Sequence, residues 1–196
     1  VPVPVEGPED VTLGSLGMLI MFGVLLRQRN ADDMRVMTLG AASWFAGNLL
    51  WLAGRPVYQV VWWWVAFLVL TIAGERLELG RMLRLSQFSR RAYLATVLVV
   101  LAGLLLQLLN LDLGTRLVGL GMLLLALWLM RYDIARYTVR QHGLTRYIAV
   151  CLLSGYFWLA VSGGMSLVFG AESAGPRYDM MLHAVLVGFV FGMVFG

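Results

Sequence analysis

The sequence predicts an all-α protein, a polytopic transmembrane helix bundle. Of its 196 residues, 60% are hydrophobic and only 13% are charged. A soluble domain of this size needs more charge to cover its surface, so this composition is typical of a protein with many membrane spans. The hydrophobic residues gather in about seven apolar stretches separated by short polar segments, which is the pattern of consecutive membrane helices.

The first ten residues differ from the rest. They contain Pro2, Pro4 and Pro8, and we expect an extended external tail or loop over residues 1–10, because proline at this density prevents a helix. Residues 11–196 form the predicted bundle. Its spans are residues 11–26, 36–52, 57–74, 92–109, 117–130, 147–169 and 180–196.

Polar residues bound most of these spans. The first, third, fourth and fifth spans end just before Arg27, Glu75, Asn110 and Arg131, and the last span begins just after Asp179 and continues to the final residue. Several are shorter than the ~20 residues that a perpendicular helix needs to cross the hydrocarbon core. We therefore expect the shortest, residues 117–130, to be tilted or partly interfacial.

All fifteen basic residues are arginine, as is typical of a GC-rich bacterial genome, and they are divided unevenly between the two sets of connecting loops. Loops after the first, third and fifth spans contain twelve: Arg27, Arg29, Arg35, Arg76, Arg81, Arg84, Arg90, Arg91, Arg131, Arg136, Arg140 and Arg146. The opposite loops contain Arg55, Arg116 and Arg177. Because basic loops stay in the cytoplasm, the sequence predicts a bacterial inner-membrane protein with the N-terminus of this segment outside.

That orientation has two further consequences. An external N-terminus without a signal sequence is unusual, so we expect the chain to be a fragment of a larger protein. The arginine-rich loops at residues 76–91 and 131–146 are expected to lie on the lipid bilayer and to favour anionic lipid. We expect no nucleic acid partner, because the charges fall where topology requires them, whereas partner subunits or a homo-oligomer remain open.

Aromatic residues gather near the predicted external ends of the second and third spans: Trp51, Tyr58, Trp62, Trp63 and Trp64. Aromatic rings with one polar edge prefer the headgroup boundary of a membrane. We interpret the group as an aromatic belt, and not as a site that stacks a ligand.

Several kinds of chemistry lack the residues they require. The single cysteine, Cys151, excludes an internal disulfide, a redox pair of cysteines and covalent haem attachment. Neither a pair of carboxylates nor a nucleophile with a base falls within the spans, so the sequence offers no case for a hydrolase. Whether the protein is another kind of enzyme stays open, although no residue pattern favours one. Without a convincing inverted repeat or paired helix breaks, a transporter is a weaker interpretation.

His183 is the only histidine inside a predicted span, because His142 falls in an arginine-rich loop. An ionisable side chain at that position indicates a functional site. Asp179 precedes it by one helical turn, and a carboxylate at this spacing commonly orients a metal-bound histidine from the second coordination shell. The alternative is that the Asp179 carboxylate only caps the start of the helix and that His183 only forms a hydrogen bond to a neighbouring helix.

Small residues follow His183 at every fourth position: Ala184, Gly188, Gly192 and Gly196. This spacing lets two helices approach closely, so we expect helix packing at these residues. Space for a flat macrocycle is a second interpretation, and the spacing alone does not separate the two.

Three segments together resemble a family of uncharacterised bacterial multispan membrane proteins: Gly-Glu-Arg-Leu-Glu-Leu-Gly-Arg at residues 74–81, Gly-Tyr-Phe-Trp-Leu-Ala at residues 155–160, and Asp179 to Gly196 with its histidine and glycines. That family is distantly similar to the NnrS-type haem membrane proteins of the nitric-oxide response. The resemblance implies a haem or metal ligand at His183 alone. In such proteins the histidine helix typically continues to a second histidine beyond the last glycine.

The sequence leaves three alternative functions for the protein. The first is a bacterial membrane protein that binds haem or a metal ion through His183 in an NnrS-like manner. The second is a structural or accessory subunit of a membrane complex without a cofactor, in which His183 and the glycines only pack. A transporter is the third. No substrate or redox partner is indicated by the residues.

Overall fold

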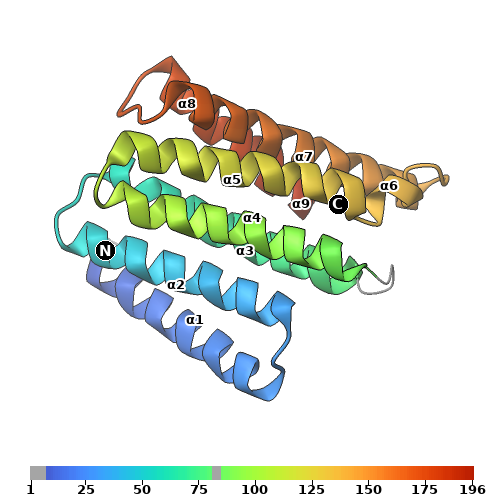
Figure 1. Ribbon diagram of the computed structural model, residues 1–196, viewed down its shortest axis with the longest axis horizontal. Coiled ribbons are helices and arrows are strands. Elements are labelled where there is room, and N and C mark those ends of the chain that lie inside the picture. The colour runs from blue at the N-terminus through green and yellow to red at the C-terminus, as the bar shows by residue number, and fades with distance from the viewer. Residues whose placement is uncertain (1–7, 81–84) are drawn as a thin grey trace, which may run out of the picture. The chain divides into compact units, whose positions relative to one another are not determined.

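The computed structural model describes residues 8–80 and 85–196, and this part of the chain is helical without a strand (Figure 1). The all-α prediction is confirmed. Residues 1–7 of the expected tail, together with Arg81 and Arg84 of the basic loop, fall outside the described residues. The helices are α1 (Pro8–Gln28), α2 (Asp32–Leu52), α3 (Val57–Leu79), α4 (Gln87–Gln107), α5 (Leu111–Tyr132), α6 (Ala135–Thr138), α7 (Leu144–Phe169), α8 (Pro176–His183) and α9 (Phe191–Val194), with a π-helix, η2 (Ala184–Val190), between the last two.

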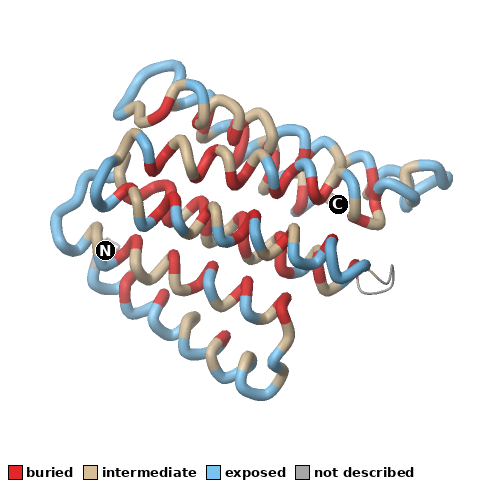
Figure 2. The backbone as a smooth tube through the Cα atoms, in the orientation of Figure 1, coloured by how far each residue is buried: buried red, intermediate tan, exposed pale blue. Residues whose placement is uncertain are grey.

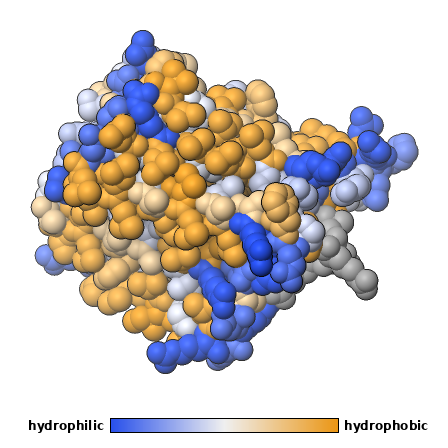
Figure 3. All heavy atoms as spheres, viewed as in Figure 1, coloured by the Kyte–Doolittle hydropathy of each residue, from blue (hydrophilic) through white to orange (hydrophobic). Residues whose placement is uncertain are grey.

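Six helical segments of the described residues are long and apolar enough to cross a membrane: α1, α3, α4, α5, α7 and the continuous segment from α8 to α9. α2 is the seventh long helix, but Arg35, Ser43 and Asn48 make it less apolar than the others. Figure 3 shows apolar side chains covering much of the visible surface along the helices. Such large exposed apolar surfaces are unfavourable in water and favourable in lipid. The chain is therefore a membrane protein.

Several helices extend beyond the predicted spans because polar residues complete their ends. α1 begins at Pro8, so the expected extended tail does not reach residue 10. Proline is compatible with the first turn of a helix, and the negative charges of Glu9 and Asp10 stabilise the positive end of the helix dipole there. α5 is 22 residues long and is not the short span predicted. The side chain of Asn110 accepts the N–H of Leu113 at 3.0 Å and caps its start.

The chain divides into two compact units, residues 1–74 and 75–196. In the first unit, α1 and α2 form a hairpin whose buried centre contains Phe22, Met37 and Ala41. α2 also packs on α3, where Trp44 stacks on Phe67 with ring centroids 4.9 Å apart. Gly40 and Gly47 allow this approach, because a Cβ at either position would meet α3 within 3.2 Å.

The aromatic belt expected at this end of α3 is only partly present. Trp62 and Trp63 are buried instead of lying at the membrane surface. Trp64 donates its indole N–H to the side-chain oxygen of Asn48 at 2.8 Å, and its ring lies edge-on to Trp51. Position in the sequence could not show these directions, since three consecutive tryptophans point to different sides of a helix.

In the second unit, α5 lies between α4 and α7. Figure 2 shows buried residues recurring along α5 on successive turns. Glycines bring the backbones together on both sides: a Cβ at Gly121 would be 2.8 Å from the backbone nitrogen of Val100 in α4, and one at Gly119 would be 2.7 Å from the carbonyl of Gly163 in α7. Close helix contact through small residues is the usual packing mode in membranes.

Side chains at the start of α5 secure the end of α7. Arg116 donates to the carbonyl oxygens of Leu167 and Val168 at 2.9 and 2.8 Å, and also pairs with Asp112 at 2.8 Å. Asp112 accepts the N–H of Ala171 at 3.1 Å. The last carbonyls of α7 lack helical partners, and these bonds satisfy them. They hold the turn that leads into α8.

Candidate functional site

The candidate site lies on the final helical segment of the second unit. Gly175 precedes this segment with a φ of 100°, a conformation that favours glycine, and Pro176 occupies its first turn. The segment continues through His183 into the π-helix η2, where the N–H of Phe191 bonds to the carbonyl of Leu186, five residues earlier. π-helical turns are rare and occur frequently at functional sites.

His183 is the last residue before the π-helix. Its Nδ1 atom lies 2.7 Å from the backbone carbonyl oxygen of Asp179. A carbonyl oxygen only accepts hydrogen bonds, so Nδ1 carries the proton and, in the neutral ring, Nε2 presents its lone pair. The side chain is exposed on the described chain. This leaves an oriented imidazole with one nitrogen open to a ligand.

The part played by Asp179 differs from the sequence prediction. Its position one turn before His183 is as expected, but its main-chain oxygen contacts the ring and its carboxylate does not form the bond. Backbone carbonyls also serve as hydrogen-bond partners of metal-bound histidines. The physical reason is local, because the carbonyl of the fourth preceding residue lies directly below a side chain on a helix.

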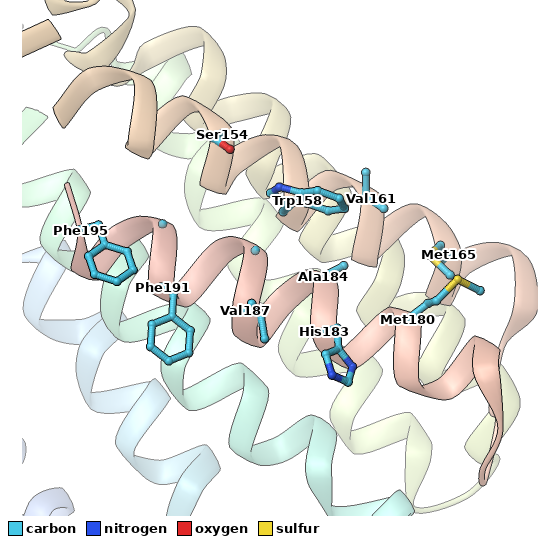
Figure 4. A pocket seen from close by; sticks show the side chains of 12 residues that line it. Ser154, Trp158, Val161, Met165, Met180, His183, Ala184, Val187, Phe191 and Phe195 are labelled. Atoms are coloured by element: carbon cyan, nitrogen blue, oxygen red, sulfur yellow. The ribbon is translucent and has the colours of Figure 1, made fainter. Parts of the chain in front are cut away.

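Beside His183 is an apolar groove with a volume of about 960 Å³, between α7 and the final helical segment. Its lining includes Trp158 and Val161 from α7, and Val187 and Phe191 from the final segment. Figure 4 shows His183, Val187 and Phe191 projecting from the same side of the helix, with Met165 and Met180 close together at one end. Among the described residues that line the groove, His183 is the only ionisable one.

The small residues after His183 face α7. A Cβ at Gly188 would clash with the Trp158 side chain, and one at Gly192 would lie 3.1 Å from the Cα atom of Gly155. A Cβ at Gly196 would meet Leu152 at 2.9 Å, and Ala184 is buried. Gly188 and Gly192 also line the groove, so the glycine face both packs on α7 and leaves space beside the histidine.

The other sequence candidates lie elsewhere. His142 is exposed between α6 and α7, and Cys151 is a partly buried free thiol whose backbone carbonyl contacts the glycine face. Across residues 8–80 and 85–196, no group of three or more histidine, cysteine, aspartate or glutamate residues is placed to hold a metal ion. The π-helix and the contribution of Trp158 were not predicted, because no residue pattern in this segment signals them.

Helical segments that can cross a membrane, together with an oriented histidine beside an apolar groove, define a polytopic membrane protein with a ligand-sized site. The chain belongs to the family described as a domain of unknown function (DUF8744), whose model matches residues 2–196. No curated protein and no solved structure matches the chain.

Proposed function

We propose that this protein is a bacterial inner-membrane protein that binds a haem-type tetrapyrrole in an NnrS-like manner, with Nε2 of His183 as the axial ligand. The observation that carries the proposal is the bond from Nδ1 of His183 to the Asp179 carbonyl oxygen, at 2.7 Å, beside the apolar groove. This bond selects the tautomer in which Nε2 can bind iron.

A tetrapyrrole fits the residues better than a bare metal ion. A metal ion needs three or four protein ligands, and the described residues contain no such group of histidine, cysteine and carboxylate side chains. A tetrapyrrole supplies four ring nitrogens itself and needs only an axial ligand from the protein. The groove is also in the usual size range of ligand sites, roughly 300–1,000 Å³, and its apolar walls suit a flat macrocycle.

In this proposal the residues have separate tasks. His183 would hold the iron, the Asp179 carbonyl orients the imidazole, and Val187 and Phe191 would offer apolar surface on the same side of the helix. Haem, when bound, would supply an iron centre that can exchange electrons or bind a small ligand. Gly188 and Gly192 keep side-chain bulk out of the groove.

The glycine face gives little support to the alternative of a subunit that only packs against a partner. Gly188, Gly192 and Gly196 already contact α7 of the same chain, so their spacing is explained without another protein. The groove beside His183 is not explained by these contacts. If the protein were only a packing subunit, lipid or a helix of another protein would have to fill the groove.

The proposed orientation places the connections after α1, α3 and α5 in the cytoplasm and the N-terminus of the segment outside. Arg136 and Arg140 are exposed there, as are the nearby aromatic side chains of Tyr137 and Tyr147. Cationic and aromatic side chains at a membrane surface favour anionic lipid headgroups, and we propose such contacts at residues 131–146.

The haem proposal is tested by optical spectroscopy of the purified full-length protein after incubation with haem. We expect a Soret band of bound haem in the wild type, loss of that band in His183→Ala and its retention in His142→Ala, which removes the other exposed histidine. In a His183→Gly variant, added imidazole should restore the band, because a free imidazole can replace the missing ligand. Equal spectra of the wild type and His183→Ala would refute the role of His183.

A further inference from the structure

A second group of ionisable side chains lies at the arginine-rich end of the same unit, away from the groove residues. Asp133 follows the last residue of α5, Tyr156 is in α7, and Arg76 is near the end of α3. Asp133 is 3% exposed and Tyr156 is fully buried, while Arg76 is partly buried. Buried ionisable groups are costly in a membrane protein and usually have a function.

The three side chains interact electrostatically, although two of them have a polar atom without a hydrogen-bond partner. Both Tyr156 and Arg76 interact with the carboxylate of Asp133. Even so, the Tyr156 hydroxyl and the Nε of Arg76 are buried without a partner at hydrogen-bonding geometry. Because an unpaired buried donor carries a high free-energy cost, both groups favour the neighbouring Asp133 carboxyl group in its charged form, which accepts hydrogen bonds.

Asp133 is held in place by its own turn. Its Oδ1 atom accepts the N–H of Ala135 at 2.8 Å, which caps the short helix α6. The arginines of α5 and α6 are engaged elsewhere: Arg131 lies over the ring of Tyr132, and Arg136 donates to the carbonyl of Arg131. The charged or titratable groups that act on Asp133 from neighbouring helices are thus Arg76 and Tyr156.

Burial raises the pKa of Asp133 above its usual value, and the Ala135 N–H, the Arg76 charge and the Tyr156 hydroxyl each oppose that rise. Burial has the larger effect because it removes the carboxylate from water. The Asp133 carboxyl group therefore keeps its proton to a higher pH than an exposed aspartate does.

We propose that Asp133, Tyr156 and Arg76 form an internal proton-binding site at the arginine-rich end of the second unit. The carboxylate of Asp133 takes up one proton from water on that side and becomes a neutral carboxyl group, and it releases the same proton on deprotonation. Tyr156 and Arg76 are positioning residues that stabilise the charged form. No covalent bond to another group is made, and the site does not depend on haem binding.

Infrared difference spectroscopy tests the proposal on the full-length protein in lipid nanodiscs. A pH titration should show a protonated carboxyl component that titrates above the range of the exposed carboxylates. Asp133→Asn should abolish this high-pH component, whereas Asp179→Asn, at an exposed carboxylate in α8, should retain it. Tyr156→Phe and Arg76→Gln should both move the titration midpoint upward, by about one pH unit for the arginine, because each removes stabilisation of the carboxylate. Arg76→Lys, which keeps the charge, should stay near the wild-type midpoint.

The proposal is overturned if the high-pH carboxyl component survives in Asp133→Asn, or if the midpoints of Tyr156→Phe and Arg76→Gln stay the same or fall. The last two variants leave Asp133 and its bond to Ala135 in place. They therefore decide the question even if Asp133→Asn does not fold.

Discussion

At the scale of single residues, Asn48 shows how a polar side chain is accommodated inside the first unit. It is fully buried in α2, its amide donates to the carbonyl of Val11 in α1 at 3.2 Å, and its oxygen accepts from Trp64 in α3 at 2.8 Å. One side chain therefore connects three helices. The sequence shows only that a polar residue falls within the second apolar span; it does not show the contacts, because both partners come from other helices.

We predict that Asn48→Leu lowers the free energy of unfolding by about 1–2 kcal/mol, since it leaves the Trp64 indole N–H without its acceptor. Thermal and denaturant unfolding of the purified protein measures this change. The matched control is a double-mutant cycle with Trp64→Phe, which removes the donor. If the two single losses simply add in the double variant, the hydrogen bond contributes nothing.

At the scale of helical elements, two adjacent glycines in α7 have opposite surroundings. A Cβ at Gly163 would lie 2.6 Å from the backbone nitrogen of Leu123 and 2.7 Å from the carbonyl of Gly119, both in α5. A Cβ at Gly164 would meet nothing within 4 Å. The sequence presents them as an equivalent pair, and only the contact with α5 distinguishes them.

We predict that Gly163→Ala destabilises the protein by roughly 1–3 kcal/mol, because backbone atoms of α5 cannot move aside as a flexible side chain can. Gly164→Ala should be neutral or stabilising by up to about 1 kcal/mol, since alanine favours a helix more than glycine does. Comparing the two unfolding temperatures under identical conditions provides the measurement. Similar temperatures for both variants would show that α5 and α7 do not cross closely at Gly163.

At the scale of the whole molecule, the division of arginines predicts which ends of the helices face the cytoplasm. In a Cys151→Ser background, a cysteine at position 140 should react with an impermeant thiol reagent only in inverted membranes. A cysteine at position 172 should react only in intact spheroplasts, because basic loops are retained on the inner side. Labelling of position 172 from the inside alone would reverse the proposed orientation.

Most of the fold could be predicted from the sequence. Composition determines that the protein is helical and enters a membrane, since lipid-exposed backbone must satisfy its own hydrogen bonds. The order of the helices followed from apolar runs between polar residues. The ends of the helices did not follow in this way. Asn110 caps the start of α5 and Asp112 forms an ion pair within its first turns, whereas their polarity suggested a connecting loop.

The candidate site could also be predicted only in part from the sequence. The sequence by itself determined that His183 lies in an apolar helix with Asp179 one turn before it and small residues after it. Tertiary structure decided that the glycines face α7 and that Asp133 and Tyr156 meet across two helices. It also decided that a groove opens beside the imidazole. The physical reason is that helical periodicity determines which residues share a face, whereas the neighbour of that face depends on packing between segments distant in the chain.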